Sequence, residues 1–378
     1  MDPGLSQRLE RHDEGLIVVS LDGGPEEMGR QHGLILAREL RTLQQGFRAY
    51  LWQVKGRLRA PVAYFLSLLM AGRLHYFISP DQRREMRALA QAARMGYGFV
   101  LLVNVLDDLV KLMSKGGLGC SAFAVHGGRT RDGRMLVGRN LDYGLFLDLL
   151  PPLTTVFRCA PTGKRAFLSV GWPGYIGAAS GMNEAGVVVS ILSSSTPDRA
   201  WQGMPEAVLC RAVLETAGSA EEAVELLSRG PRRTCGNNFL VADEAEAMVV
   251  EVSARAAEVR RMQDDTITVT NHYQTPAMQA RQGPFFRRPA GSELPEEFFT
   301  EAYSRARDER LRTGCLAGPL DAKQARELLR DSGIASAATV QSMLFRPASR
   351  NLWVARATAT PVCKGEFVEI RGGGQSWR

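Results

Sequence analysis

The spacing of apolar residues changes near residue 115. Before it, apolar positions recur at helical spacing, after one β-branched run at Gly15–Leu21 that is typical of a strand. The helices predicted there are Pro25–Val54, Val62–Phe77, Pro80–Met95 and Val100–Met113. Beyond the glycine-rich stretch 115–119, short apolar runs bounded by glycine, aspartate or proline predict strands.

The second part of the chain alternates runs of strands with helices. The expected helices are Met204–Arg229, with a break at Gly218, Glu296–Arg312 and Asp321–Asp331. The expected strands are Ser121–His126, Met135–Arg139, Thr154–Arg158, Arg165–Val170, Gly186–Leu192, Asn238–Ala242, Ala247–Val252, Ala257–Arg260, Thr266–Thr270, Thr339–Phe345, Asn351–Ala355 and Gly365–Ile370. Runs of strands without regular β-α alternation favour an α+β fold in which helices cover sheets.

Composition and charge narrow the function classes. The chain is 45% hydrophobic and 23% charged, as a globular protein is. Its net charge of +7 is scattered and forms no basic stripe interleaved with aromatic residues, so we expect no nucleic-acid partner. An anionic substrate and a loose membrane association both fit this charge. The six cysteines include no C-x-x-C motif and no Cys/His cluster, so we expect no metal and no cofactor.

The N-terminus and one apolar stretch bear on location. The first residues lack a basic segment followed by an apolar one, so no signal peptide is visible and we expect a cytoplasmic protein. Val62–Ala71 is too short to span a bilayer, so we expect no stable membrane insertion. This stretch predicts a buried helix; the alternative is a surface patch that contacts lipid or lines an acyl-chain pocket.

The segment from Gly119 to Tyr143 carries the candidate chemistry. Its pattern predicts a hairpin in which Cys120 starts one strand, Asp132-Gly133 forms the turn, and the second strand returns to Arg139. This pairing brings Arg139 and Asp142 near the Cys120 end, where a guanidinium lowers a thiol pKa. A cysteine at the start of a strand is usually an inert core residue, and only the neighbouring Arg139 and Asp142 favour a catalytic role for Cys120.

Gly-Cys-Ser followed by Gly-Arg-Asn-x-Asp resembles the cysteine-type N-terminal-nucleophile hydrolases. These include choloylglycine hydrolase, penicillin V acylase, acid ceramidase-like amidases and the isopenicillin-N acyltransferase (C45) family. The segment from Leu21 to Gly33 resembles the start of the acyltransferase branch, in which the cysteine lies deep in the chain. The resemblance implies a four-layer αββα sandwich with a mainly helical N-terminal pro-segment.

The resemblance also implies roles for individual residues. Cys120 would be the nucleophile and its freed α-amine the base, with a pKa near the model value of about 7.7–8.0. Arg139 and Asp142 would contact the nucleophile and its amine, and Asn271 would donate to the oxyanion. Ser304 and Arg305 match a Ser-Arg pair on a late helix, where Arg305 would close the polar network. His272 is interpreted as structural or adjacent to substrate.

One position departs from the pattern. Where choloylglycine hydrolases carry a second donor asparagine, this chain has Ser193, whose hydroxyl or a backbone N–H would complete the oxyanion hole. Tyr143, Trp172 and Tyr175 are candidate pocket walls, although each of these aromatic types is more often plain core.

The resemblance predicts that the chain cuts itself between Gly119 and Cys120. Residues 1–119 would then form a light chain packed on the catalytic domain, residues 120–378; the alternative is that 116–119 is merely a flexible loop. The fragments would weigh about 13 and 28 kDa. Gly119 has no β-carbon, which eases close approach of the backbone.

The predicted activity is that of an amidohydrolase or acyltransferase that cleaves a linear amide through a thioester. Two alternatives are a papain-like cysteine protease, which lacks a fitting motif here, and a non-catalytic binding member of the same fold. Expected partners are a small acyl-amide substrate and the chain's own light chain, with a homo-oligomer left open. Acyl-homoserine lactones, N-acyl amino acids, β-lactam side chains, peptides and lipid amides all suit the chemistry.

Overall fold

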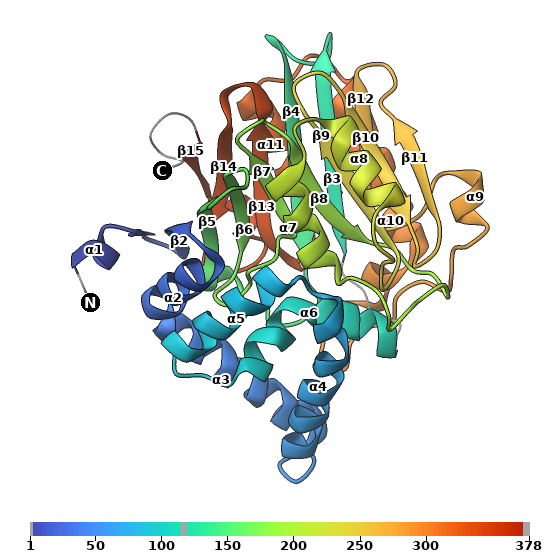
Figure 1. Ribbon diagram of the computed structural model, residues 1–378. Coiled ribbons are helices and arrows are strands. Elements are labelled where there is room, and N and C mark those ends of the chain that lie inside the picture. Colours follow the sequence, from blue (N-terminus) through green and yellow to red (C-terminus); the bar gives the residue numbers. More distant parts are fainter. Residues whose placement is uncertain (1–2, 115–118, 373–378) are drawn as a thin grey trace.

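Two sheets lie face to face between two layers of helices (Figure 1). The computed structural model describes residues 3–114 and 119–372. In this part of the chain the larger sheet has nine strands in the order β1 (Leu9–His12), β2 (Leu16–Gly23), β5 (Thr154–Pro161), β6 (Phe167–Gly171), β7 (Ser180–Asn183), β8 (Val188–Ser193), β9 (Asn237–Ala242), β10 (Ala247–Val252) and β11 (Ala257–Arg261). The smaller has six in the order β12 (Thr266–Val269), β3 (Cys120–Gly127), β4 (Gly133–Asp142), β13 (Thr339–Arg346), β14 (Asn351–Arg356) and β15 (Glu366–Arg371).

The helices fall into three groups. The N-terminal group is α1 (Pro3–Ser6), α2 (Pro25–Ile35), α3 (Ala37–Lys55), α4 (Ala60–Leu74), α5 (Pro80–Ala92) and α6 (Tyr97–Ser114). The larger sheet is covered by α7 (Glu206–Thr216) and α8 (Ala220–Arg229), and the smaller by α10 (Glu301–Leu316) and α11 (Ala322–Arg330), with a short α9 at Pro276–Gln279. Short 3₁₀ helices lie at His75–Phe77, Pro151–Leu153, Glu296–Phe299, Pro347–Ser349 and Val362–Lys364.

Three apolar cores hold these layers together. One lies between the sheets and includes Ala122, Val137 and Val188. The second lies between the larger sheet and its helices, and the third between the smaller sheet and α10 and α11. Strands β3 and β8 are buried on both faces because each is enclosed by a sheet on one side and helices on the other. The α+β four-layer sandwich expected from the sequence is therefore confirmed.

Some elements differ from the predicted ones. The helix expected over Pro25–Val54 is two helices, because Leu36 leaves helical geometry at φ −107° and ψ 21°. The break expected at Gly218 is present, between α7 and α8. Strands β1 and β7 were not predicted, since each is only four residues long. Strand β2 runs parallel to β5, and β1 pairs with β2, so residues before Cys120 complete one edge of the larger sheet.

The expectation of a buried helix at Val62–Ala71 is wrong. Helix α4 packs on α3 and α6 through one face only, with Tyr64 and Leu68 partly buried there. Phe65 is 64% exposed and Leu69 57% exposed on the opposite face. No helix in the described residues is long and apolar enough to cross a membrane.

Candidate functional site

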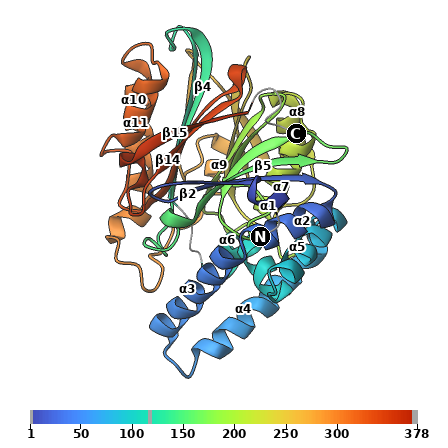
Figure 2. The same ribbon diagram turned by 90° about the vertical axis from the view of Figure 1, so that its left-hand side faces the viewer.

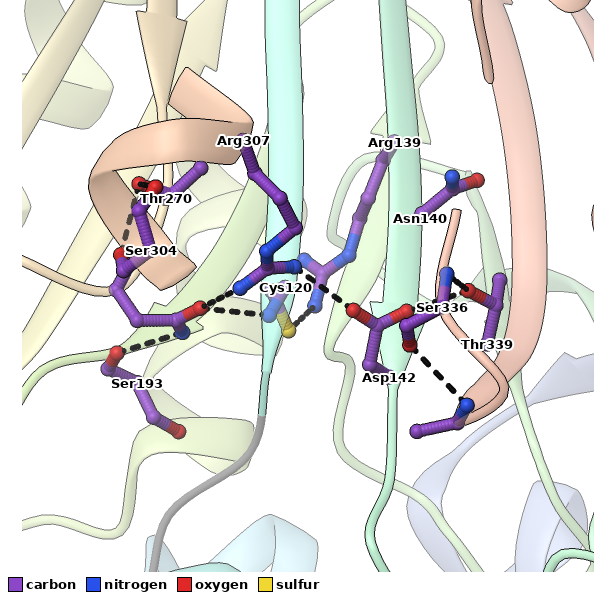
Figure 3. A network of polar contacts seen from close by, with 12 residues as sticks. Cys120, Arg139, Asn140, Asp142, Ser193, Thr270, Ser304, Arg307, Ser336 and Thr339 are labelled. Atoms are coloured by element: carbon purple, nitrogen blue, oxygen red, sulfur yellow. Dashed lines mark hydrogen bonds and ion pairs between the residues drawn. The ribbon is translucent and has the colours of Figure 1, made fainter. Parts of the chain in front are cut away.

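Cys120 is the first residue of β3 and lies in the interior of the smaller sheet (Figure 3). The predicted hairpin is present: β3 and β4 pair antiparallel, with Cys120 opposite Leu141 and Ala122 opposite Arg139. Arg139 Nη2 donates to Cys120 Sγ at 3.4 Å, while its Nη1 donates to the carbonyl of Ala179 at 2.8 Å. The hairpin and the neighbouring sheet thus fix a cation beside a fully buried thiol.

The peptide link before Cys120 is held on both sides. The carbonyl oxygen of Gly119 accepts a hydrogen bond from the backbone N–H of Asp142 at 2.8 Å. The backbone nitrogen of Cys120 donates to Oδ1 of Asn271, also at 2.8 Å. Residues 115–118 of the expected interdomain link lie outside the described residues. The carbonyl oxygen and the nitrogen of the peptide bond that a cleavage would break therefore each have a fixed partner.

Arg307 connects the two sides of this arrangement. Its Nη1 donates to Asp142 Oδ2 at 2.8 Å and its Nη2 to Asn271 Oδ1 at 2.9 Å. The other carboxylate oxygen of Asp142 accepts from the hydroxyl of Thr339 at 2.7 Å. The carboxylate is thereby held by charge-assisted hydrogen bonds from two elements, α10 and β13.

The expectation that Arg305 closes the polar network is wrong. Its side chain is 52% exposed and pairs with Glu301 on the same helix. The buried residues of α10 are Ser304, Arg307, Leu311 and Cys315. Positions three and four apart share a helix face, so the buried Ser304 places Arg307 on its face and turns Arg305 outward.

The orientation of the Asn271 amide follows from its neighbours. Two donors, the Cys120 nitrogen and Arg307 Nη2, point at the same oxygen, which identifies it as Oδ1. Nδ2 then donates to the carbonyl of Ser193 at 2.9 Å, and the hydroxyl of Ser304 accepts from the Asn271 backbone N–H at 2.9 Å. Asn271 therefore links β8, α10 and the nitrogen of Cys120.

Burial dominates the electrostatics of the site. It raises the pKa of the Cys120 thiol, and the lowering by Arg139 does not offset it, so the lowered thiol pKa expected from the sequence is wrong for the uncleaved chain. Burial also raises the pKa of Asp142, against the opposing effect of Arg307. Desolvation lowers the pKa of His272 to about 4; its Nδ1 contacts the hydroxyl of Ser304 at 3.0 Å, which fits a neutral structural histidine.

A cavity of about 90 Å³ opens beside Cys120 between the sheets and the N-terminal helices. Arg139 and Ser193 also border it. Most of the remaining wall is apolar and comes from α3 and α6, from the end of β4 and the segment after it, and from the loop after β6: Leu43, Phe47, Phe99, Leu102, Val103, Leu106, Leu141, Tyr143, Phe146, Leu149, Leu150, Trp172 and Tyr175. The three aromatic residues expected from the sequence as pocket walls are among them.

A buried polar group forms one end of this cavity. Asp107, Asp108 and Glu206 border it, and Lys111 pairs with Glu206. Burial and the charge of Glu206 raise the pKa of Asp107 to about 7, and the same causes raise the pKa of Asp108 well above its usual value. This group could not be recognised from the sequence, because two acids and a lysine on one helix normally indicate a solvated face. In the described residues, no group of three or more His, Cys, Asp or Glu side chains is arranged to hold a metal ion.

The comparisons with known proteins assign the family. The model of the acyl-coenzyme A:6-aminopenicillanic acid acyl-transferase family matches residues 129–355, more than half of the chain, so the chain belongs to this family. The resemblance to cysteine-type N-terminal-nucleophile hydrolases is thereby confirmed. The matched range begins after Cys120, so the roles of Gly119 and Cys120 depend on geometry.

Individual relatives are distant. An uncharacterized protein of Archaeoglobus fulgidus is 26% identical over 311 residues, which cover 70% of this chain and 51% of the relative. Acid ceramidase of Bos taurus is 23% identical over 191 residues, covering 44% of this chain and 46% of the ceramidase. The chain thus spans about half the length of the curated relatives it matches. The solved structure of penicillin V acylase from Agrobacterium tumefaciens aligns with a TM-score of 0.46 and 17% identity, over 68% of this chain and 88% of that one.

Proposed function

We propose that this chain is a self-activating cysteine enzyme that cleaves a linear amide through a thioester, as an amidohydrolase or acyltransferase. The observation that carries the proposal is the clamp on the Gly119–Cys120 peptide bond. The Gly119 oxygen, the Cys120 nitrogen and the Cys120 sulfur each have a partner, in Asp142, Asn271 and Arg139 respectively. Related proteins in the same family and in the ceramidases act on acyl groups, which supports the same chemistry here.

The first step is the cut that frees the nucleophile. Cys120 Sγ attacks the Gly119 carbonyl carbon, whose oxygen is already polarised by the Asp142 N–H. The thiol proton passes to the Cys120 nitrogen as the C–N bond breaks, which leaves a thioester. Water hydrolyses this thioester to give the carboxylic acid of Gly119 and a Cys120 that carries both a thiol and an α-amine. Residues 1–119 remain as the light chain.

The light chain stays bound because it completes the core. Strand β2 is hydrogen-bonded to β5, and helices α3 and α6 supply much of the cavity wall. Losing the light chain would expose these apolar surfaces to water. The proposed boundary at residue 119 therefore separates two pieces of the chain that both belong to one fold.

In turnover the freed α-amine accepts the thiol proton, and Cys120 Sγ attacks the carbonyl carbon of the substrate amide. Asn271 Oδ1 orients the amine, since it accepts from the same nitrogen in the uncleaved chain. We assign stabilisation of the oxyanion to the side-chain amide of Asn271 together with Ser193, a residue that borders the cavity. The amine product leaves with the proton, and Arg139 keeps the sulfur in place.

The cavity indicates an apolar acyl group. Apolar side chains make up most of its wall, so acyl chains gain free energy from burial there, at about 25 cal/mol per Å² of apolar area. A strongly polar acyl group would lose its hydration against these apolar side chains, which offer it no hydrogen-bond partner. The amine half of the substrate is not specified by this wall.

A screen of fluorogenic N-acyl amides of increasing acyl length tests the proposal. We expect release of the fluorogenic amine and, after acid quenching, the mass of one acyl group on Cys120. Cys120→Ala should lose activity by roughly 10³-fold or more, whereas Cys159→Ala, at another buried cysteine, should keep it. Turnover that survives Cys120→Ala would refute the proposal. Adding a small amine separates the two activities, because an acyltransferase forms the new amide and a hydrolase forms the free acid.

A further inference from the structure

The exposed apolar residues of the protein gather at one place. Seven of the eleven large hydrophobic side chains that are exposed in the described residues lie between residues 52 and 76. We call the surface formed by the end of α3, the turn after it and the outer face of α4 the α3–α4 tip. Its exposed hydrophobic residues are Trp52 (54% exposed), Leu58 (92%), Val62 (58%), Phe65 (64%), Leu66 (49%) and Leu69 (57%).

These residues form one surface. Val62, Phe65, Leu66 and Leu69 are spaced three, one and three residues apart, which places them on a single face of α4. The tip projects away from both sheets (Figure 2), so in one chain no layer of the sandwich covers this face. Contiguous exposed apolar surface of this kind marks a site of contact with a protein or a membrane.

The charges around the tip indicate which of these two partners, a protein or a membrane, the tip contacts. Residues 40–80 contain six lysine and arginine residues and no aspartate or glutamate. All six, which are Arg41, Arg48, Lys55, Arg57, Arg59 and Arg73, are exposed. Lys55 is the last residue of α3, and Arg57 and Arg59 lie in the turn on either side of Leu58, which is 92% exposed. An apolar face whose own segment carries cations and no acidic residue matches an anionic lipid surface, into which the apolar side chains insert while the cations contact phosphate groups.

A second copy of the chain is a poorer match for the same surface. Two tips in contact would bring Lys55, Arg57 and Arg59 of one copy close to the same cations of the other, without an acidic residue from the same segment to pair with them. Trp52 at the rim also fits an interface between water and lipid, where amphipathic aromatic side chains concentrate.

From this combination we propose that the α3–α4 tip docks the protein on the surface of an anionic lipid bilayer without crossing it. The docked surface adjoins the site already described. Tyr64 on the inner face of α4 lies 6.1 Å from Phe47, and Phe47 lies 6.2 Å from Phe146, measured between ring centroids. Phe47 and Phe146 are both part of the cavity wall, so the apolar tip and the cavity are joined by aromatic packing.

Sedimentation with lipid vesicles tests this inference on the purified full-length protein. The vesicles are phosphatidylcholine with about a quarter phosphatidylglycerol, compared with phosphatidylcholine alone. We expect binding to the anionic vesicles that weakens as salt is raised. Phe65→Ser/Leu69→Ser should weaken it by roughly tenfold or more, and Arg57→Glu/Arg59→Glu should weaken it on anionic vesicles. The matched control is Leu226→Ser/Val259→Ser, at two exposed apolar positions on α8 and β11, which should bind as the parent does.

The results that would overturn the inference are equally definite. Absence of binding to anionic vesicles would do so, as would equal binding by the parent and Phe65→Ser/Leu69→Ser. Light scattering on the same samples tests the alternative, in which a second copy of the chain covers the tip. A dimer that is dissociated by Phe65→Ser/Leu69→Ser, together with no vesicle binding, would make the tip an interface between copies. Vesicle binding is measured without substrate, so its outcome is independent of whether Cys120 is the nucleophile.

Discussion

The guanidinium of Arg307 donates a 2.8 Å hydrogen bond to Oδ2 of Asp142, and both side chains are almost completely buried. Two charges removed from water in this way depend on each other, because neither has solvent to replace a lost partner. Asp142 also supplies the backbone N–H that holds the Gly119 carbonyl. This ion pair thus supports the strand end on which the proposed cleavage depends.

Replacing Arg307 should therefore be costly. Arg307→Ala leaves the Asp142 carboxylate buried without its cation, and we expect the free energy of unfolding to fall by about 3–5 kcal/mol. Self-cleavage should slow as well, since the clamp loses its support. Arg305→Ala is the matched control, because Arg305 forms an exposed pair with Glu301 on its own helix and its loss should change stability by less than about 1 kcal/mol. Urea unfolding of the two variants measures the difference, and equal losses would contradict the position given to Arg307.

Gly119→Ala should slow self-cleavage while the protein still folds. A β-carbon at Gly119 would lie 3.3 Å from both Cβ and Oδ2 of Asp142, so the carbonyl must shift from the Asp142 N–H. A cost of about 1.4 kcal/mol in the transition state would slow the cut about tenfold. Gly96→Ala, where a β-carbon meets nothing within 4 Å, is the control. The fraction cut over time on a denaturing gel is the measurement, and equal rates for the two variants would count against the clamp.

Asn271→Ala should reduce kcat more than it changes KM. The variant removes the acceptor that orients the Cys120 nitrogen and the amide assigned to the oxyanion, and loss of one such donor costs about 10²–10³-fold in kcat. Asn351→Ala, whose side chain bonds Glu369 at the surface, should leave both constants unchanged. Steady-state kinetics on a cleaved sample separate the two constants. A raised KM with an unchanged kcat would instead make Asn271 a residue for substrate binding.

Asp107 should make stability depend on pH in a defined direction. Its pKa in the folded protein is about 7, above the model value of 3.8, so the folded state holds the proton over a range where the unfolded state has lost it. The free energy of unfolding should therefore fall as pH rises from about 4 through about 7. The groups that act on Asp107 are Glu206, Lys111, Tyr143 and Arg139. Asp107→Asn should flatten this fall in unfolding experiments at several pH values; a profile parallel to that of the parent would contradict the raised pKa.

The fold was largely predictable because its signals are local. Alternating apolar runs locate most strands, and the break between α7 and α8 follows from the Gly218 region. The hairpin of β3 and β4 could be predicted, since a turn near Gly133 brings Arg139 and Asp142 back toward Cys120. Its register could not, because an irregularity after Val125 lets Gly127 pair with Gly133. The short strands β1 and β7 could not, because four residues are too few to show a clear alternation of apolar and polar positions.

The site was predictable only where it is local. The contact between Arg139 and Cys120 follows from one hairpin, whereas that between Arg307 and Asp142 joins residues 165 positions apart. The helical spacing from Ser304 would have favoured Arg307 over Arg305, provided that Ser304 was known to be buried. The thiol pKa was misjudged because a sequence reveals a neighbouring charge but not the degree of burial that outweighs it. Hydrophobicity alone could not distinguish the exposed face of α4 from a face buried in the core, because both kinds of face consist of the same apolar residue types.

The central claim is that Cys120 frees its own amine, and the N-terminal mass of the larger fragment tests it most directly. Protein purified without added protease should give fragments of about 13 and 28 kDa, the larger one beginning at Cys120. Cys120→Ala should stay as one chain of 41.5 kDa. An active protein with the Gly119–Cys120 bond intact, or a Cys120→Ala protein cut at the same bond, would contradict the account.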